Sequence, residues 1–283
     1  MQLTVLLNIG QSHDILEQCL TGLMAQTLGA AQFEILIPTQ NGIAETIAAA
    51  SDQGLLVKQI DETSFGHLIE NAVQAPLVAC LSSDVVPAPH WAAEITAAAT
   101  NHEAAIFRGN THAQWRGGER PLWITDWMLH AYGCSCAPAS DYDPNVGNVV
   151  YRQDTLRSAT NVLKHLSLDL LTGRNVVSVI LKDQGAQSIG VPDMETTRPI
   201  LQEEQTPEWL SKTLFKGGRI AAKQAQFLTQ HLREPPPWAD IRPPTGMRDW
   251  EAMVNLLPDG TLEETLIKIH DLGFLLGQVG LLD

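Results

Sequence analysis

The sequence predicts an α/β protein whose mostly parallel central sheet is covered by helices on both faces. Over the first 80 residues, short apolar runs alternate with segments whose apolar residues recur every three or four positions. The runs are typical of buried strands, and the periodic segments are typical of amphipathic helices. Strands that alternate with helices form parallel sheets in a three-layer α/β/α sandwich, and their ligands bind beyond the carboxyl ends of the strands.

The expected elements follow one another in regular steps. Strands are expected at residues 3–7, 33–37, 55–60, 77–81 and 104–107, and helices at residues 15–24, 43–50 and 65–73. Pro38 and the turn Gln40-Asn41-Gly42 end the second strand, because proline cannot donate to a strand ladder and Asn-Gly favours a turn. A proline-started helix is expected soon after the fourth strand.

Composition limits the classes of function. The chain has 283 residues, of which 32 are acidic and 18 are basic, so its formal net charge is −14. This charge argues against a general nucleic-acid binder. No apolar run reaches the ~18 residues of a membrane-spanning helix, and the first strand lacks the basic flank of a signal peptide, so we expect a cytoplasmic protein. The four cysteines are expected to be reduced thiols, because Cys134-Ser-Cys136 has no second pair to complete a zinc site.

Common nucleotide-binding motifs are missing from the sequence. No Gly-x-Gly-x-x-Gly and no Gly-Lys-Ser/Thr segment follows any of the expected strands. Dinucleotide and Walker-type phosphate sites depend on those glycines for close approach of the backbone to phosphate. The sequence therefore disfavours both kinds of site.

The end of the fourth strand carries the most informative residues. The segment Ser82-Ser83-Asp84 places a carboxylate directly past a buried strand. A carboxylate at that edge can hold Mg²⁺ or Mn²⁺, which prefer oxygen ligands and can bridge two phosphates. The alternative is an acidic residue that only complements the dipole of the following helix. The enzymatic hypothesis fails if the Asp84 carboxylate faces no cavity, or if it pairs with lysine or arginine deep in the packing.

The order of these features resembles the family 2 glycosyltransferases of GT-A fold over residues 3–190. The segments that carry the resemblance are 23–28, 33–37, 70–72, 75–78, 81–84, 87–91 and 147–152. The resemblance implies a GT-A-type sandwich that transfers a sugar from a nucleotide-sugar donor, usually with inversion, and with Mg²⁺ or Mn²⁺ near Asp84. The donor-binding residues that it implies are Asn8, Gly10, Thr39, Gln40, Asn41, Asn71, Ser82, Ser83 and Asp84.

The chain departs from the family pattern at three acidic positions. Thr39 and Gln40 follow the second strand where the family has a carboxylate, and the family's Asp-x-Asp becomes Ser82-Ser83-Asp84. Of the family's Glu-Asp region only Asp169 remains. We interpret Asp169 as the general base, because an inverting transfer needs a carboxylate that takes the proton of the acceptor hydroxyl. The alternative is a solvated helix aspartate.

Weaker candidates lie further along the chain. His112 follows the fifth strand and could add a metal ligand. Trp115 belongs to an aromatic-rich stretch through residue 132, whose flat apolar faces suit a sugar ring or simply the core. Asp141 and Asp143 are interpreted as part of an acceptor-side loop. The expected acceptor is a carbohydrate, a lipid-linked molecule or a small molecule.

A second region begins after the transferase-like part. We expect a GT-A-like domain at residues 1–190 and a C-terminal helical extension at residues 191–283, with residues 195–205 leaving the α/β core. A helix is expected at residues 209–224, and its cations Lys212, Lys216, Arg219 and Lys223 share one face. That face could approach donor phosphates or an anionic membrane surface, or it could be merely solvated. A final apolar-faced helix, capped by Thr261 and Glu264, suits docking on a membrane or formation of a homo-oligomer.

Three functional hypotheses follow from the sequence. The first is a metal-assisted glycosyltransferase. The second is a non-catalytic GT-A-like module that binds sugar or nucleotide, or serves as a scaffold, because acidic positions of the family pattern are lost. The third, a nucleotidyltransferase, is disfavoured because no glycine-rich basic loop follows the first strand.

Overall fold

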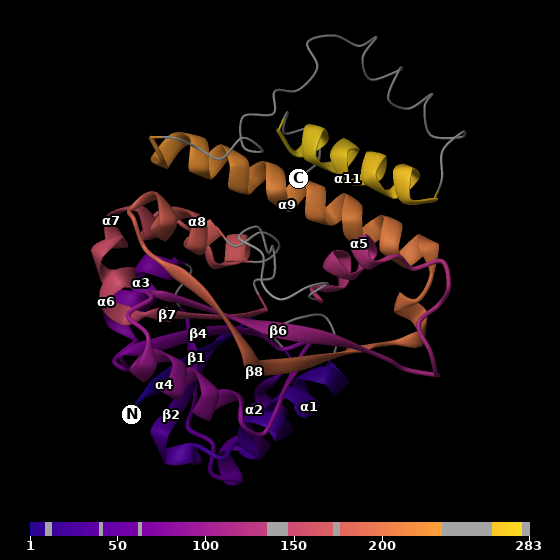
Figure 1. Cartoon of the computed structure of the whole chain (residues 1–283). Helices are drawn as coiled ribbons and strands as arrows, with labels where there is room; N and C mark the ends of the chain where they lie inside the picture. The colour runs from indigo at the N-terminus through magenta and orange to yellow at the C-terminus, as the bar shows by residue number, and fades with distance from the viewer. Residues whose placement is uncertain are drawn as a thin grey trace. The chain divides into compact units, whose positions relative to one another are not determined.

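The computed structural model describes residues 1–8, 13–39, 42–61, 64–134, 147–171, 176–233 and 262–278 (Figure 1). The chain divides into two compact units. One comprises residues 1–114 and 133–199, and the other comprises residues 115–132 and 200–283. The expected division after residue 190 stays a prediction.

One sheet organises the first unit. In the described ranges it has eight strands in the order β3-β2-β1-β4-β7-β6-β8-β5. The strands are β1 (Leu3–Asn8), β2 (Phe33–Pro38), β3 (Val57–Ile60), β4 (Leu77–Ser82), β5 (Val86–Pro87), β6 (Ile106–Trp115), β7 (Asn148–Arg152) and β8 (Ser188–Ile200). Strands β1 to β4 run parallel to one another, whereas β7 runs antiparallel to both β4 and β6, and β5 runs antiparallel to β8.

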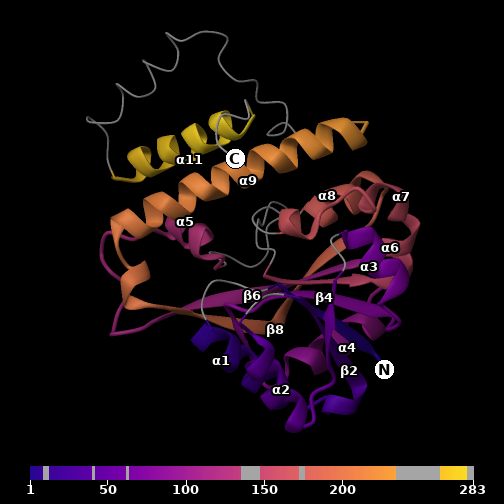
Figure 2. The same cartoon turned by 180° about the vertical axis from the view of Figure 1, so that it is seen from behind.

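Helices cover both faces of this sheet (Figures 1 and 2). One face carries α1 (His13–Met24), α2 (Ala44–Asp52) and α4 (Trp91–Asn101), and the other carries α3 (Phe65–Asn71), α6 (Gln153–Ser158), α7 (Thr160–Leu163) and α8 (Val176–Asp183). From β1 through β2 to β3 the chain moves toward one edge of the sheet, and from β3 it crosses back over both strands to form β4 on the other side of β1. Right-handed crossovers therefore place α3 on the opposite face from α1 and α2. The three-layer α/β architecture predicted from the sequence is confirmed.

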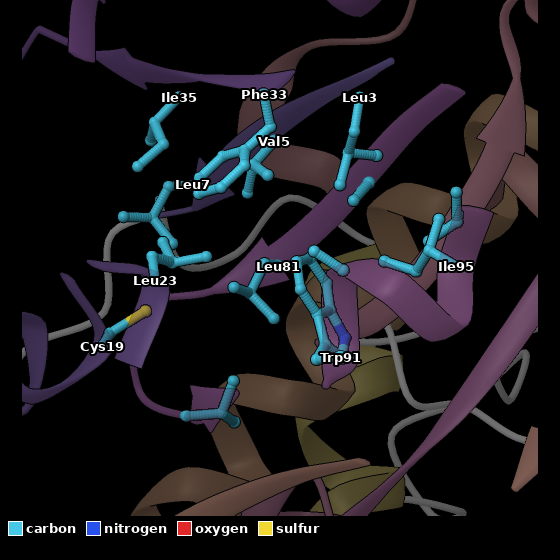
Figure 3. Close-up of a cluster of buried hydrophobic side chains, with 14 of the residues drawn as sticks. Leu3, Val5, Leu7, Cys19, Leu23, Phe33, Ile35, Leu81, Trp91 and Ile95 are labelled. Carbon is cyan, nitrogen blue, oxygen red and sulfur yellow. The ribbon is translucent and has the colours of Figure 1, made fainter. Parts of the chain in front are cut away.

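The main core lies between the sheet and α1, α2 and α4 (Figure 3). Alternation along β1 sends Leu3, Val5 and Leu7 into this core, where all three are fully buried. Trp91 and Ile95 at the start of α4 meet them from the helix layer. Burial of each such side chain contributes about 1.5–3 kcal/mol, so the core fixes the strand register and hence where each strand ends.

Two local expectations need correction. The helix expected after β4 is present as α4, but it begins at Trp91 and not at a proline, and Val86–Pro87 forms the short strand β5. Residues 195–200 do not leave the core but complete β8, because buried Met194 and Thr196 alternate with exposed Glu195 as a strand requires. The fifth strand is confirmed but is longer than expected, since β6 continues to Trp115.

The second unit is built on α9 (Pro207–His231) and α11 (Leu262–Gln278), together with the short α5 (Asp126–Leu129). Thr206 caps α9 by accepting from the Trp209 amide, and Pro207 occupies the first turn. Gly273 lies against Phe215, and Gly277 lies against Ala222, so the two helices run parallel. Added Cβ atoms at Gly218 and Gly273 would lie 2.0 and 2.2 Å from backbone oxygens, which shows how closely the helices approach.

Helices at both expected C-terminal positions are thereby confirmed. None of the helices in the described ranges combines the length and the apolar composition needed to cross a bilayer.

Candidate functional site

The carboxyl ends of β1 and β4 bring several predicted donor-binding residues together. Asn8 pairs with Ser82 in the parallel ladder, and the Ser83 amide donates to the Asn8 carbonyl at 2.8 Å. The Asp84 amide then donates to Ser82 Oγ at 3.3 Å. These bonds end β4 in a tight turn that leads toward β5. Asn8, Ser82, Ser83 and Asp84 therefore lie together at the edge where ligands of parallel sheets bind.

Asp84 forms an ion pair with Arg198 of β8. The Arg198 Nη1 to Asp84 Oδ2 distance is 3.3 Å, and the two side chains are 13% and 20% exposed, respectively. The pairing of Val86 with Thr197 between β5 and β8 sets this contact. Burial, with a smaller contribution from the Asp84 charge, also raises the pKa of the Cys19 thiol in α1. Asp84 thus lies at the edge of the packing, between the end of the sheet and α1.

A buried polar network fixes the part of β8 that precedes Arg198. Asn148 Oδ1 accepts from the Trp91 indole at 2.8 Å, and Asn148 Nδ2 donates to the carbonyls of Met194 at 2.8 Å and Asn110 at 3.0 Å. The Thr111 and Thr196 hydroxyl oxygens lie 2.8 Å apart. Because each polar group here is buried, losing one partner would be costly, and the network holds β6, β7 and β8 in one register.

Gly109 explains how β6 fits against this network. A Cβ atom at Gly109 would lie 2.1 Å from the Met194 carbonyl oxygen and 2.3 Å from Asn148 Nδ2. A side chain at this position would separate the strands that Asn148 joins. The glycine is therefore required by close packing of the backbone.

The expected metal ligands Asp84 and His112 are not brought together. His112 Nε2 contacts Glu195 Oε1 at 3.3 Å, and both side chains are more than half exposed. Glu195 and Arg198 are three residues apart on β8, so their side chains leave opposite faces of the sheet. His112 therefore lies on the face opposite to the Asp84–Arg198 pair.

The Asp84 carboxylate does not fit as the anchor of a divalent cation. One of its oxygens already faces a guanidinium, whose positive charge would repel a cation placed beside it. In the part of the chain that the structure describes, no group of three or more His, Cys, Asp or Glu side chains could hold a metal ion. The oxygen-rich ligand set that Mg²⁺ and Mn²⁺ require is thus lacking among these residues.

Thr39 lies at the same carboxyl edge, because it directly follows β2, the parallel neighbour of β1, and its amide and hydroxyl both donate to the Ile60 carbonyl. The other predicted site residues are dispersed. Asn71 ends α3, which returns the chain to the amino end of β4, so Asn71 lies at the edge opposite to Asp84. Trp115 belongs to the second unit, where its ring meets Tyr132 edge-on at 5.7 Å. Tyr132 in turn stacks on Trp209 at 5.1 Å, so these aromatic rings pack on one another.

The last predicted residues are the proposed general base and residues of the donor and acceptor loops. Asp169 lies in a 3₁₀ turn at Leu168–Leu171. Gly10, Gln40, Asn41, Asp141 and Asp143 lie outside the described residues. Their roles stay predictions.

Arg198 and Asn148 are the site residues that the sequence did not reveal. Asn148 belongs to a segment interpreted only through the family resemblance. Arg198 lies in a stretch expected to leave the core. The signal that could have found Arg198 is the alternation of Met194, Thr196 and Arg198 on one face of a strand.

No protein-family model and no curated protein matches the chain. Solved structures do resemble it. TarS 1–349 of S. aureus in complex with UDP-GlcNAc has 12% identity and a TM-score of 0.53, over 99% of this chain and 91% of that one. The mannosyltransferase PcManGT of Pyrobaculum calidifontis, in complex with GDP-Man and Mn²⁺, has 12% identity and a TM-score of 0.54, over 95% and 72% of the two chains. The likeness shows that this chain has a GT-A-like fold.

Proposed function

We propose that the chain is a glycosyltransferase of family 2 type, which transfers a sugar from a nucleotide-diphosphate sugar to an acceptor hydroxyl with inversion. The observation that carries the proposal is the grouping of Asn8, Ser83, Asp84 and Arg198 at the carboxyl edge of a GT-A-like sheet. The similarity to structures solved with UDP-GlcNAc and GDP-Man supports a donor of this class.

The chemistry assigned to these residues follows the movement of charge during transfer. The bond between the anomeric carbon and the diphosphate oxygen breaks, and a bond to the acceptor oxygen forms on the opposite face of the sugar. The leaving diphosphate gains negative charge, which hydrogen-bond donors and a cation fixed in place before the reaction stabilise. Arg198 and the amide and hydroxyl groups at the ends of β1 and β4 offer such groups.

Asp169 is proposed as the general base. In an inverting transfer, a carboxylate accepts the proton of the acceptor hydroxyl as the new bond forms, and this step contributes ~10²–10⁴-fold to the rate. The family resemblance points to Asp169 for this role. Mg²⁺ or Mn²⁺ is the cofactor that the same resemblance suggests, and it would neutralise diphosphate charge. Since the Asp84 geometry does not fit it, we assign no step to a metal.

A specific observation also favours the second candidate, a non-catalytic module that binds nucleotide or sugar. The carboxylate expected to hold a metal is paired with arginine, as it would be in a chain that keeps the fold without the reaction. Such a module would bind a nucleoside diphosphate and transfer nothing.

Release of UDP or GDP from UDP-GlcNAc, UDP-glucose and GDP-mannose, measured over a panel of sugar acceptors, tests the proposal. We expect turnover with at least one donor, and a loss of ~100-fold or more in kcat for Asp169→Asn. Asp183→Asn, at an exposed residue at the end of α8, is the matched control. Binding of nucleotide without turnover would favour the non-catalytic module, and absence of both binding and turnover would reject both candidates.

A further inference from the structure

We propose that Arg198, rather than a divalent cation, supplies the positive charge that holds the diphosphate of the donor. This inference rests on the proposed function, and it names Arg198 as the residue that binds the anionic part of the donor. It also gives Asp84 a different role. Asp84 becomes a positioning residue for the guanidinium and not a metal ligand.

The first argument is the pairing itself. Arg198 Nη1 lies 3.3 Å from Asp84 Oδ2, where a metal would have to compete with a fixed positive charge for the same carboxylate. A guanidinium carries five N–H donors in a planar fork, so the group can meet a carboxylate with one edge and phosphate oxygens with another. The arrangement therefore suits an anion better than a second cation.

The second argument is the position of the pair. Asp84 follows β4 by two residues, at the edge where Asn8 and Ser82 also end their strands. Arg198 reaches this edge from β8, because β8 is hydrogen-bonded to β5 directly after Asp84. A ligand at the carboxyl ends of β1 and β4 would thus meet the guanidinium from β8 and polar groups from two parallel strands.

The third argument is rigidity. Thr196, two residues before Arg198, contacts Thr111, and the carbonyl of Met194 accepts from Asn148. These bonds are buried, so β8 cannot shift without breaking them. A charge held in place before the ligand arrives needs little reorganisation, which is the condition for effective electrostatic stabilisation. The side chain is also 13% exposed, so part of it faces solvent.

Calorimetric titration of the full chain with UDP and with GDP tests the inference. Each nucleotide is titrated in excess EDTA and again in excess Mn²⁺. We expect one of them to bind, with dissociation constants in the two conditions that agree within about twofold. Arg198→Gln should weaken that binding ~10-fold or more, because a charge-assisted hydrogen bond is lost. Arg157→Gln, at an exposed arginine on α6, should leave it unchanged.

Two further measurements keep the result interpretable. Thermal unfolding shows whether Arg198→Gln is folded. If it is not, Arg198→Lys keeps the charge but loses the planar fork, and it should bind with intermediate affinity. Binding that appears only with Mn²⁺, or that survives Arg198→Gln unchanged, overturns the inference while leaving the proposed function intact. Failure of both nucleotides to bind in either condition rejects the proposed function as well.

Discussion

Two ion pairs in the first unit show how position changes the role of the same chemistry. Glu34, in the middle of β2, has a side chain that is 2% exposed, and it accepts from Thr4 at 2.9 Å and from Lys58 at 2.8 Å. Asp84 and Arg198 form the other pair, past the end of β4. In the first pair the carboxylate is enclosed and only the lysine, 52% exposed, reaches water. In the second pair both partners are partly exposed at the carboxyl edge of the sheet.

The comparison separates a structural ion pair from a candidate binding pair. The Glu34–Lys58 pair joins β2 to β3 on the sheet face opposite to the main core, and its geometry leaves a ligand no access to the carboxylate. The Asp84–Arg198 pair lies past the end of β4, where both side chains are partly exposed and where we propose that a diphosphate binds. We therefore expect substitutions at the first pair to change stability alone, and substitutions around the second pair to change nucleotide binding.

The largest expected loss of stability comes from Asn148→Ala. It removes the acceptor of the buried Trp91 indole and the donor to two backbone carbonyls, so we expect the free energy of unfolding to fall by about 3 kcal/mol. Urea denaturation measures the loss, and Asn101→Ala, at an exposed position that ends α4, is the control. The remaining folded protein should also bind UDP or GDP less tightly, because β8 positions Arg198. Wild-type stability for Asn148→Ala would contradict the assigned network.

Lys58→Met should cost less, about 2 kcal/mol, because it leaves the buried Glu34 carboxylate without its counter-charge. The figure is below that for a fully buried pair, since Lys58 is half exposed and water can approach. Urea denaturation is again the measurement. The double variant Glu34→Leu/Lys58→Met should recover most of the loss, because an apolar pair needs no charge compensation.

Neither Lys58→Met nor the double variant should alter nucleotide affinity in the folded protein. Lys212→Met is the matched control for the loss of stability in Lys58→Met. It breaks an exposed ion pair with Glu208, one helical turn away, and should leave the denaturation midpoint unchanged. A change in nucleotide affinity for Lys58→Met would break the distinction between the two pairs.

The parts of the fold that were predictable are those whose evidence is local. Leu3, Val5 and Leu7 form an apolar run that identifies β1 without reference to any other segment, and the same holds for β2 and β4. The position of Asp84 followed directly from the end of β4. For these residues the local sequence pattern alone is enough to predict a buried strand and its end.

The partner of Asp84 was not predictable, because its evidence is long-range. Arg198 is 114 residues away in the chain, and the strand that carries it contains Pro192, Asp193 and Glu195, which locally indicate a loop. Pairing with neighbouring strands, and not intrinsic preference, makes this segment a strand. The ion pair that replaces the expected metal contact depends on that pairing. For this reason the sequence indicated the position of Asp84 but not the side chain that pairs with it.

Asp84→Asn should have a small effect on stability, about 1 kcal/mol, because the oxygen of the amide can still accept a hydrogen bond from Arg198. The amide keeps the size of the side chain and loses the charge that positions Arg198. We expect UDP or GDP to bind a few-fold less tightly in calorimetry, with no new requirement for Mn²⁺. Loss of a Mn²⁺-dependent component of binding would instead return Asp84 to the role of metal ligand.

The smallest effect concerns Cys19, whose reactivity reports the charge of Asp84. Burial, followed by the Asp84 carboxylate, raises the pKa of this thiol, so little thiolate exists near neutral pH and alkylation by iodoacetamide should be much slower in the native chain than in urea. Because the folded thiol has the higher pKa, its contribution to stability is complete below the unfolded value of about 8.5 and is lost as the pH rises above it. Asp84→Asn removes the weaker of the two causes and should speed alkylation only slightly, as followed by mass spectrometry of the Cys19 peptide. A large increase would mean that Arg198 does little to offset the Asp84 charge, and the positioning role assigned to that pair would fail.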